Sequence, residues 1–218
     1  GADQEIFAGY LMADIWASKK LRMVGGARLE TTNIVVRSYD QSQELGELKE
    51  TDILPALNTS YALTEKTNIR ASVSRTLARP TFREIAPFAT YDFSTNWTIV
   101  GNPDLERTLV DNIDFRVETY PNFGEIISIG GFYKSFTNPI ELVFNTQAQN
   151  DELTWRNIDK ATVYGAEFEI KKNLSFLSDS ANTFTVGANF TYVFSEVGID
   201  EQELNLIKAN DENADETR

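Results

Sequence analysis

The sequence predicts an all-β protein: an antiparallel, up-and-down segment of a transmembrane β-barrel, about eight strands wide, with short periplasmic turns and long extracellular loops. Apolar and polar residues alternate with a period of two along most of the chain. The connections between these segments alternate between short and long. Several segments exceed about ten residues, and strands of that length tilted by about 40° rise about 25 Å, the height of the apolar band of an outer-membrane barrel.

Composition excludes several classes of function. The chain has 33 acidic and 20 basic residues, a formal charge of −13, which would repel the phosphates of a nucleic acid. It contains no Cys and no His, so Ser-His-Asp and Cys-His catalysis and zinc sites built on imidazole or thiolate are excluded. No run approaches the roughly 18 apolar residues of a membrane helix, but a barrel strand needs only about 9–11 residues with one apolar face.

The first half of the chain predicts four strands. They cover about 5–17, 21–37, 53–63 and 69–78. The connections between them cover 18–20, 38–52 and 64–68. In the second strand Leu21 and Met23 alternate with Arg22, and in the third Leu57 alternates with Asn58, so one face suits lipid and the other suits water.

Arg75 conflicts with this alternation, because it falls on the apolar face of 69–78 at mid-height. An Arg facing lipid there costs about 2–4 kcal/mol. Two explanations remain open at this stage: a bulge reverses the register before Arg75, or its side chain snorkels toward water.

The second half predicts four more strands after the longest insertion, 79–108. They cover about 109–120, 125–145, 153–172 and 183–195. The turn at 121–124 contains Gly124, which can adopt a positive φ. Residues 1–197 therefore form a partial barrel wall, and 198–218 form an acidic extracellular loop that is cut partway. That loop carries seven acidic residues, namely Asp200, Glu201, Glu203, Asp211, Glu212, Asp215 and Glu216.

Charged residues recur on the polar face of the strands, where a barrel would have its lumen. This lumen-facing ladder comprises Arg28, Glu30, Asp114, Arg116, Glu118, Glu167 and Glu169. Glu167 and Glu169 are about 6.6 Å apart along one face, close to the spacing of an inverting glycosidase pair. A water-filled barrel interior explains the same charges without catalysis, and we favour it.

The insertion at 79–108 is rich in aromatic residues that could stack on a sugar or a chelate. Its candidate ligand-binding residues are Arg83, Phe88, Tyr91, Phe93 and Trp97. Pro80 ahead of 82–85 favours a short helix at the start of the insertion. The simpler alternative is a loop that packs on itself over the barrel mouth.

Four stretches in order resemble the C-terminal half of the barrel of TonB-dependent receptors, especially those of Bacteroidota. They read SRTLARPTFRE at 74–84, GNPDL at 101–105, FYKSFTNPIE at 132–141 and ATVYGAE at 161–167. The resemblance implies a larger barrel of which this chain is a fragment. The plug, the segment that contacts TonB and the closing C-terminal strand would lie outside the chain.

This resemblance implies an outer-membrane receptor that captures and imports an external ligand such as a siderophore, cobalamin or an oligosaccharide. Its expected partners are the lipid bilayer, the rest of the barrel with its plug, TonB through the N-terminal part, and the small ligand. We expect no enzyme activity, cofactor, metal or nucleic acid. The alternative is a soluble β-rich carbohydrate-binding or adhesin-like module, whose apolar faces would be buried against each other.

Overall fold

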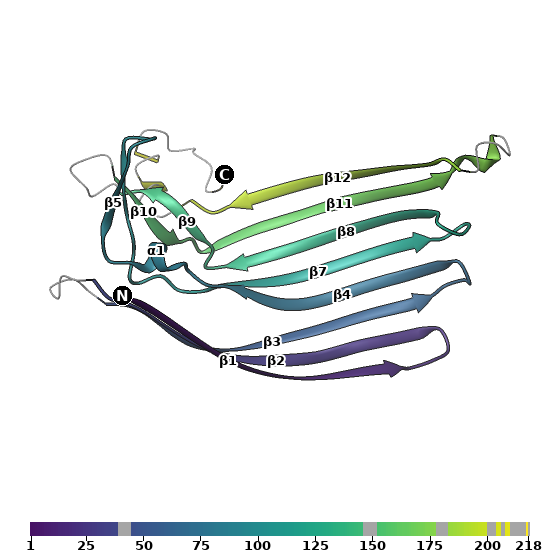
Figure 1. Cartoon of the computed structure of the whole chain (residues 1–218), viewed down its shortest axis with the longest axis horizontal. Helices are drawn as coiled ribbons and strands as arrows, with labels where there is room; N and C mark the ends of the chain where they lie inside the picture. Colours follow the sequence, from purple (N-terminus) through teal and green to yellow (C-terminus); the bar gives the residue numbers. More distant parts are fainter. Residues whose placement is uncertain are drawn as a thin grey trace.

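Eight long strands form one antiparallel sheet, which we call the wall. A computed structural model describes residues 1–38, 45–145, 152–177, 183–199, 204–205, 208–209 and 217. The wall strands are β1 (Ala2–Trp16), β2 (Leu21–Val36), β3 (Gly46–Ala62), β4 (Thr67–Ala78), β7 (Thr108–Thr119), β8 (Ile126–Thr137), β11 (Lys160–Asn173) and β12 (Thr185–Val197). They lie in the order β1-β2-β3-β4-β7-β8-β11-β12, which confirms the predicted up-and-down segment (Figure 1).

A second, smaller sheet lies beyond one end of the wall (Figure 1). It contains β5 (Ala89–Asp92), β6 (Trp97–Val100), β9 (Ile140–Phe144) and β10 (Glu152–Asn157), in the order β5-β6-β10-β9. The parallel pairing of β6 with β10 joins the two longest insertions of the chain. We call this end of the wall the loop end, the small sheet the loop-end sheet, and the opposite end the turn end.

Three predicted boundaries were wrong. The third wall strand begins at Gly46, because the stretch up to Asp52 alternates inward Leu48 with outward Glu47 and Lys49 despite its polar composition. The strand predicted over 125–145 divides into β8 and β9, and the one over 153–172 divides into β10 and β11. Asn138 between β8 and β9 has a φ of 54°, which ends the extended backbone before the chain enters the loop-end sheet.

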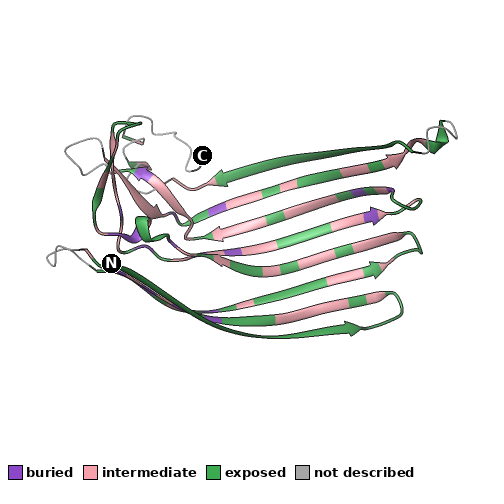
Figure 2. Ribbon diagram, in the orientation of Figure 1, coloured by how far each residue is buried: buried purple, intermediate pink, exposed green. Residues whose placement is uncertain are grey.

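The register confirms the predicted alternation between two faces of the wall. Phe190 lies opposite Phe168 on the apolar face, and Thr191 lies opposite Glu167 on the polar face. Figure 2 shows that most wall residues are exposed or half-buried. Phe190 is 64% exposed, so the apolar face is not packed against a second sheet as a soluble sandwich would require.

Arg75 remains on the apolar face, because β4 pairs with β7 without a break from Thr67 to Ala78. The bulge considered from the sequence is therefore contradicted. Asp111 lies directly opposite, and its carboxylate accepts hydrogen bonds from Nε and Nη2 of Arg75 at 2.7 and 2.8 Å. The two side chains are 43% and 49% exposed. Sequence reasoning did not identify Asp111 as a neutralising partner on the same face.

The turn between β7 and β8 carries a buried carboxylate. Gly124 has a φ of 75°, as predicted for this turn. Glu125 accepts hydrogen bonds from Nζ of Lys172 and Nδ2 of Asn122, both at 2.9 Å, and from the backbone N–H of Asn173 at 3.1 Å. The pKa of Glu125 is below its ordinary value. The hydrogen bond from Lys172 contributes most to this lowering, and the one from Asn122 contributes less. The turn is thereby tied to the end of β11.

Two further observations complete the fold. Across the described ranges, no helix combines the length and the apolar character needed to cross a membrane. The seven acidic residues of the predicted C-terminal loop lie outside the described residues.

Candidate functional site

The insertion between β4 and β7 folds back onto the polar face of the wall at its loop end. It begins with α1 (Phe82–Ile85), the helix predicted from the sequence, which starts at a capping box formed by Thr81 and Glu84. Ile85 is fully buried and belongs to the core cluster at this end of the molecule. That cluster comprises Ile34, Val36, Leu48, Ile85 and Ala86.

Gly46 allows the insertion to approach this closely. A Cβ at Gly46 would collide with the backbone carbonyl oxygen of Ile85. Gly101 has the same role on the other side of the insertion, where a Cβ would collide with the carbonyl oxygen of Ala86. The start of the insertion is therefore held between β3 and the segment that follows β6.

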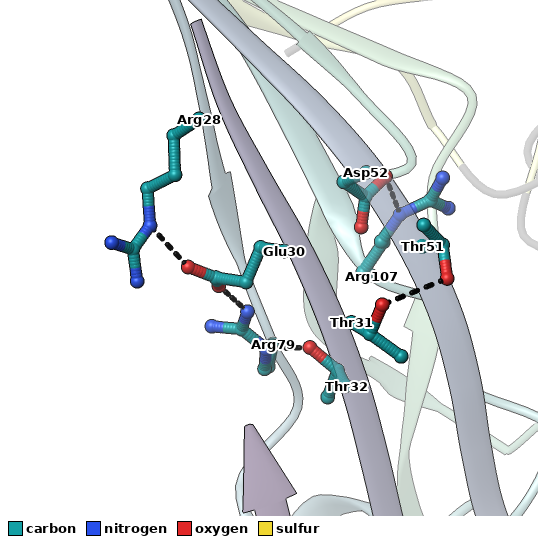
Figure 3. Close-up of polar contacts among 8 residues, drawn as sticks. All are labelled: Arg28, Glu30, Thr31, Thr32, Thr51, Asp52, Arg79 and Arg107. Atoms are coloured by element: carbon teal, nitrogen blue, oxygen red, sulfur yellow. Dashed lines mark hydrogen bonds and ion pairs between the residues drawn. The ribbon is translucent and has the colours of Figure 1, made fainter. Parts of the chain in front are cut away.

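Beside this core lies a cluster of three arginines and three carboxylates, and Figure 3 shows all of them except Glu50. Its members are Arg28, Glu30, Glu50, Asp52, Arg79 and Arg107, and we call it the arginine cluster. Glu30 and Asp52 are opposite each other in the β2–β3 register, and their exposed fractions are only 7% and 5%. Buried carboxylates of this kind are stable only when charged donors pair with them.

The cluster supplies those donors from the insertion. Arg79 donates to the Glu30 carboxylate and, through Nε, to Oγ1 of Thr32 at 2.9 Å. Arg107 donates through Nε to Oδ1 of Asp52 at 2.6 Å, and its Nη2 is 3.6 Å from Oε2 of Glu50.

Two further features describe the cluster. Arg28 donates to Glu30 at 2.6 Å from the wall itself. Burial, and then the charge of Arg28, lowers the pKa of Arg79 relative to an ordinary arginine.

The loop-end sheet separates the predicted ligand-binding aromatics into two groups. Tyr91 and Phe93 meet edge to face with ring centroids 5.0 Å apart. Trp97 meets Phe144 at 5.2 Å. Because Tyr91 pairs with Thr98 and Asp92 pairs with Trp97, the side chains of Tyr91 and Trp97 lie on opposite faces of the sheet.

The remaining candidates lie nearer the start of the insertion. Phe88 and Arg83 are both exposed, and Arg83 belongs to α1. Sequence reasoning missed Phe144 and Trp155, which β9 and β10 bring to the face of Trp97. Their aromatic character was visible, but both residues were assigned to long wall strands.

The predicted charged ladder lies on the polar face of the wall, and its members interact across strands. Arg116 donates to Glu169 at 2.5 Å, and Ser72 donates to Asp114 at 3.0 Å. Glu118 accepts from Nε of Arg70. Arg28 and Glu30 extend the same face into the arginine cluster.

A family model described as "TonB dependent receptor-like, beta-barrel" matches residues 1–217. The chain belongs to this family. TonB-dependent receptor barrels are outer-membrane proteins whose strands alternate between lipid and the barrel interior, so both faces of the wall have a physical explanation. No curated protein is similar enough in sequence to match the chain.

Solved TonB-dependent receptors share this fold at low sequence identity. The ferric enterobactin receptor PfeA is 21% identical, with a TM-score of 0.64 over 88% of this chain and 27% of its own. The siderophore receptor PirA from Pseudomonas aeruginosa is 18% identical, with a TM-score of 0.60 over 89% of this chain and 43% of its own. The copper transporter OprC is 14% identical, with a TM-score of 0.68 over 90% of this chain and 29% of its own.

These structures bear on the fold alone, and this chain spans less than half the length of each of them. Assignment to Bacteroidota remains a prediction. Within the described residues of this TonB-dependent receptor barrel, no group of three or more acidic side chains is arranged to hold a metal ion. The three solved proteins described above are two receptors and a transporter. Glu169, one of the two carboxylates of the alternative glycosidase pair, forms an ion pair with Arg116.

Proposed function

We propose that this chain is part of an outer-membrane receptor that binds an external ligand at its loop end and imports it without covalent chemistry. The observation that carries the proposal is the loop-end sheet, which exposes aromatic side chains and is anchored to the polar face of a two-faced wall. Phe93 lies in the turn between β5 and β6, where it is 86% exposed and meets Tyr91 edge to face. Large exposed aromatics at one place favour a binding surface.

The orientation follows from the lengths of the connections. Barrels of this kind have short turns on the periplasmic side and long loops outside, so the loop-end sheet faces the exterior. The apolar face then contacts the lipid bilayer, and the charged ladder faces the lumen. The rest of the barrel, its plug and TonB, reached through the N-terminal part, are the other partners.

We further propose that the ligand belongs to the siderophore, cobalamin or oligosaccharide class, and we favour a siderophore. Arg83, Phe88, Tyr91, Phe93 and Trp97 are the proposed contacts. Aromatic rings stack on flat ligand rings, and an arginine attracts an anionic chelate. Two of the similar receptors are named for siderophores, which supports this choice.

Binding of ferric enterobactin to the full-length parent receptor, reconstituted in lipid vesicles, tests the proposal. We expect the fluorescence of the receptor to be quenched on binding, and Phe93→Ala and Trp97→Ala to weaken binding. Phe123→Ala is the matched control, because Phe123 is fully exposed at the turn end. A parent that is a water-soluble monomer without detergent would contradict the membrane assignment. Equal affinities of all three variants would contradict the assigned surface.

A further inference from the structure

The two ends of the first insertion leave the wall at the same level. Ala78, the last residue of β4, lies opposite Thr108, the first residue of β7. The next residue outward on each side is an arginine, Arg79 and Arg107. Their side chains bind Glu30 and Asp52, which are themselves opposite each other across β2 and β3. Two ion pairs thus connect the residues beside the Ala78–Thr108 pair to the Glu30–Asp52 pair.

Arg107 also lies where the second insertion is attached. The backbone N–H of Glu106 donates to Oδ1 of Asn157 at 2.8 Å, and Nδ2 of Asn138 donates to Glu106 at 2.6 Å. Oγ1 of Thr108 donates to the carbonyl oxygen of Asn138 at 2.9 Å. The residues on both sides of Arg107 therefore bind the roots of β9 and β10, while its own side chain binds the wall.

Loss of either arginine would leave a buried carboxylate with fewer charged partners. Asp52 depends most on its arginine, because its Oδ1 accepts a hydrogen bond from Arg107 and its Oδ2 is buried without a hydrogen-bond partner. Restoring solvation to such a group requires water to enter beneath the insertion. Movement of the insertion away from β2 and β3 would admit that water.

We propose that Arg79 and Arg107 are positioning residues that fix the orientation of the loop-end sheet relative to the wall. By holding both ends of the insertion on Glu30 and Asp52, they preform the loop-end sheet, whose two faces carry the two groups of aromatic side chains proposed to contact the ligand. The proposal rests on the proposed function, since it assigns the arginines a role in ligand binding. The arginines themselves need not touch the ligand.

Distances between spin labels test the positioning without any ligand. This chain has no native cysteine, so Thr95→Cys and Lys49→Cys place labels on the β5–β6 turn and on β3. In the full-length receptor in lipid nanodiscs we expect one narrow distance distribution. Arg107→Gln should broaden it, and Arg79→Gln with Arg107→Gln should broaden it further.

Two variants separate positioning from general damage. Reversing one pair with Arg107→Glu and Asp52→Arg should restore a narrow distribution. Arg22→Gln is the matched control, because Arg22 forms an exposed pair with Asp14 toward the turn end and should leave the distribution unchanged.

Ferric enterobactin then serves as the binding probe. If the ligand-competent orientation falls to about a tenth of the population, the apparent affinity falls about tenfold. A narrow distribution retained in the double glutamine variant would overturn the positioning role. If wild-type receptor does not bind ferric enterobactin, that siderophore is excluded as its ligand, and the distances alone decide the positioning.

Discussion

Exchanging Phe190 and Thr191 separately for arginine tests whether the apolar face of the wall contacts lipid. The two residues are neighbours near the middle of β12, and their side chains point to opposite faces. Arg at position 190 would face lipid near mid-height, at a cost of about 2–4 kcal/mol. It would also lose the contact of Phe190 with Phe168 opposite, worth about 0.2–1 kcal/mol.

The neighbouring substitution should behave differently. Thr191→Arg places a guanidinium opposite Glu167 on the polar face, where a cross-strand ion pair contributes about 0.2–1 kcal/mol. The two variants should therefore differ by about 3 kcal/mol, more than a hundredfold in the folding equilibrium. Urea titration of the full-length receptor refolded into vesicles measures the difference. Equal midpoints for Phe190→Arg and Thr191→Arg would refute a lipid-facing apolar surface.

Three smaller predictions concern the insertion, the β7–β8 turn and the β1–β2 pair. Ile85→Ala should cost about 2–5 kcal/mol of local stability, seen as faster hydrogen exchange at the loop ends of β2 and β3; unchanged exchange would argue against this core. Because Lys172 lowers the pKa of Glu125 in the folded protein, the ionised Glu125 stabilises the fold fully at pH values above its ordinary pKa of 4.5. This stabilisation is lost as the pH falls through the lower pKa of the folded protein. Glu125→Gln should therefore reduce the acid dependence of the thermal midpoint, and an identical pH profile would count against the contact. Gly26→Ala should lower the refolding yield, because the added Cβ would collide with the backbone of β1. Gly187→Ala is the control, because a Cβ there meets only ordinary van der Waals contacts. Equal refolding yields of the two variants would disprove the steric argument.

The faces of the wall could be predicted because alternation is a local property of an extended chain. Whichever strand pairs with β12, Phe190 and Thr191 point in opposite directions. Arg75 shows the limit of this reasoning. Its placement on the apolar face was correct, but its partner Asp111 is 36 residues away, and only the β4–β7 register brings the two together.

The loop-end sheet could not be predicted, because a period of two does not indicate which sheet a strand joins. Apolar and polar residues alternate in the two later strands of this sheet as they do in the wall. Sequence reasoning therefore assigned both strands, Ile140–Phe144 and Glu152–Asn157, to the wall. The signal that could have separated the first of these was Asn138 followed by Pro139, a pair that favours a turn. As a result the aromatic set was incomplete and lacked Phe144.

The arginine cluster was only partly visible in the sequence. Arg28 and Glu30 were assigned to the charged ladder, and they lie on the predicted face. Asp52 and Arg107 were placed in loops, since the strand that contains Asp52 was expected to start after it. A one-residue slip of β3 would turn Asp52 to the other face, so the cluster depends on a register that composition does not fix.

The loop-end sheet also couples the two insertions to each other. Both insertions depart from and return to facing positions of the wall, Ala78 with Thr108 and Thr137 with Lys160. Recombination could therefore replace both segments without shifting a single pair of the eight-stranded ladder. Replacing one alone would break the parallel pairing of β6 with β10. We therefore expect that exchanging both segments together preserves the loop-end sheet, whereas exchanging one alone disrupts it.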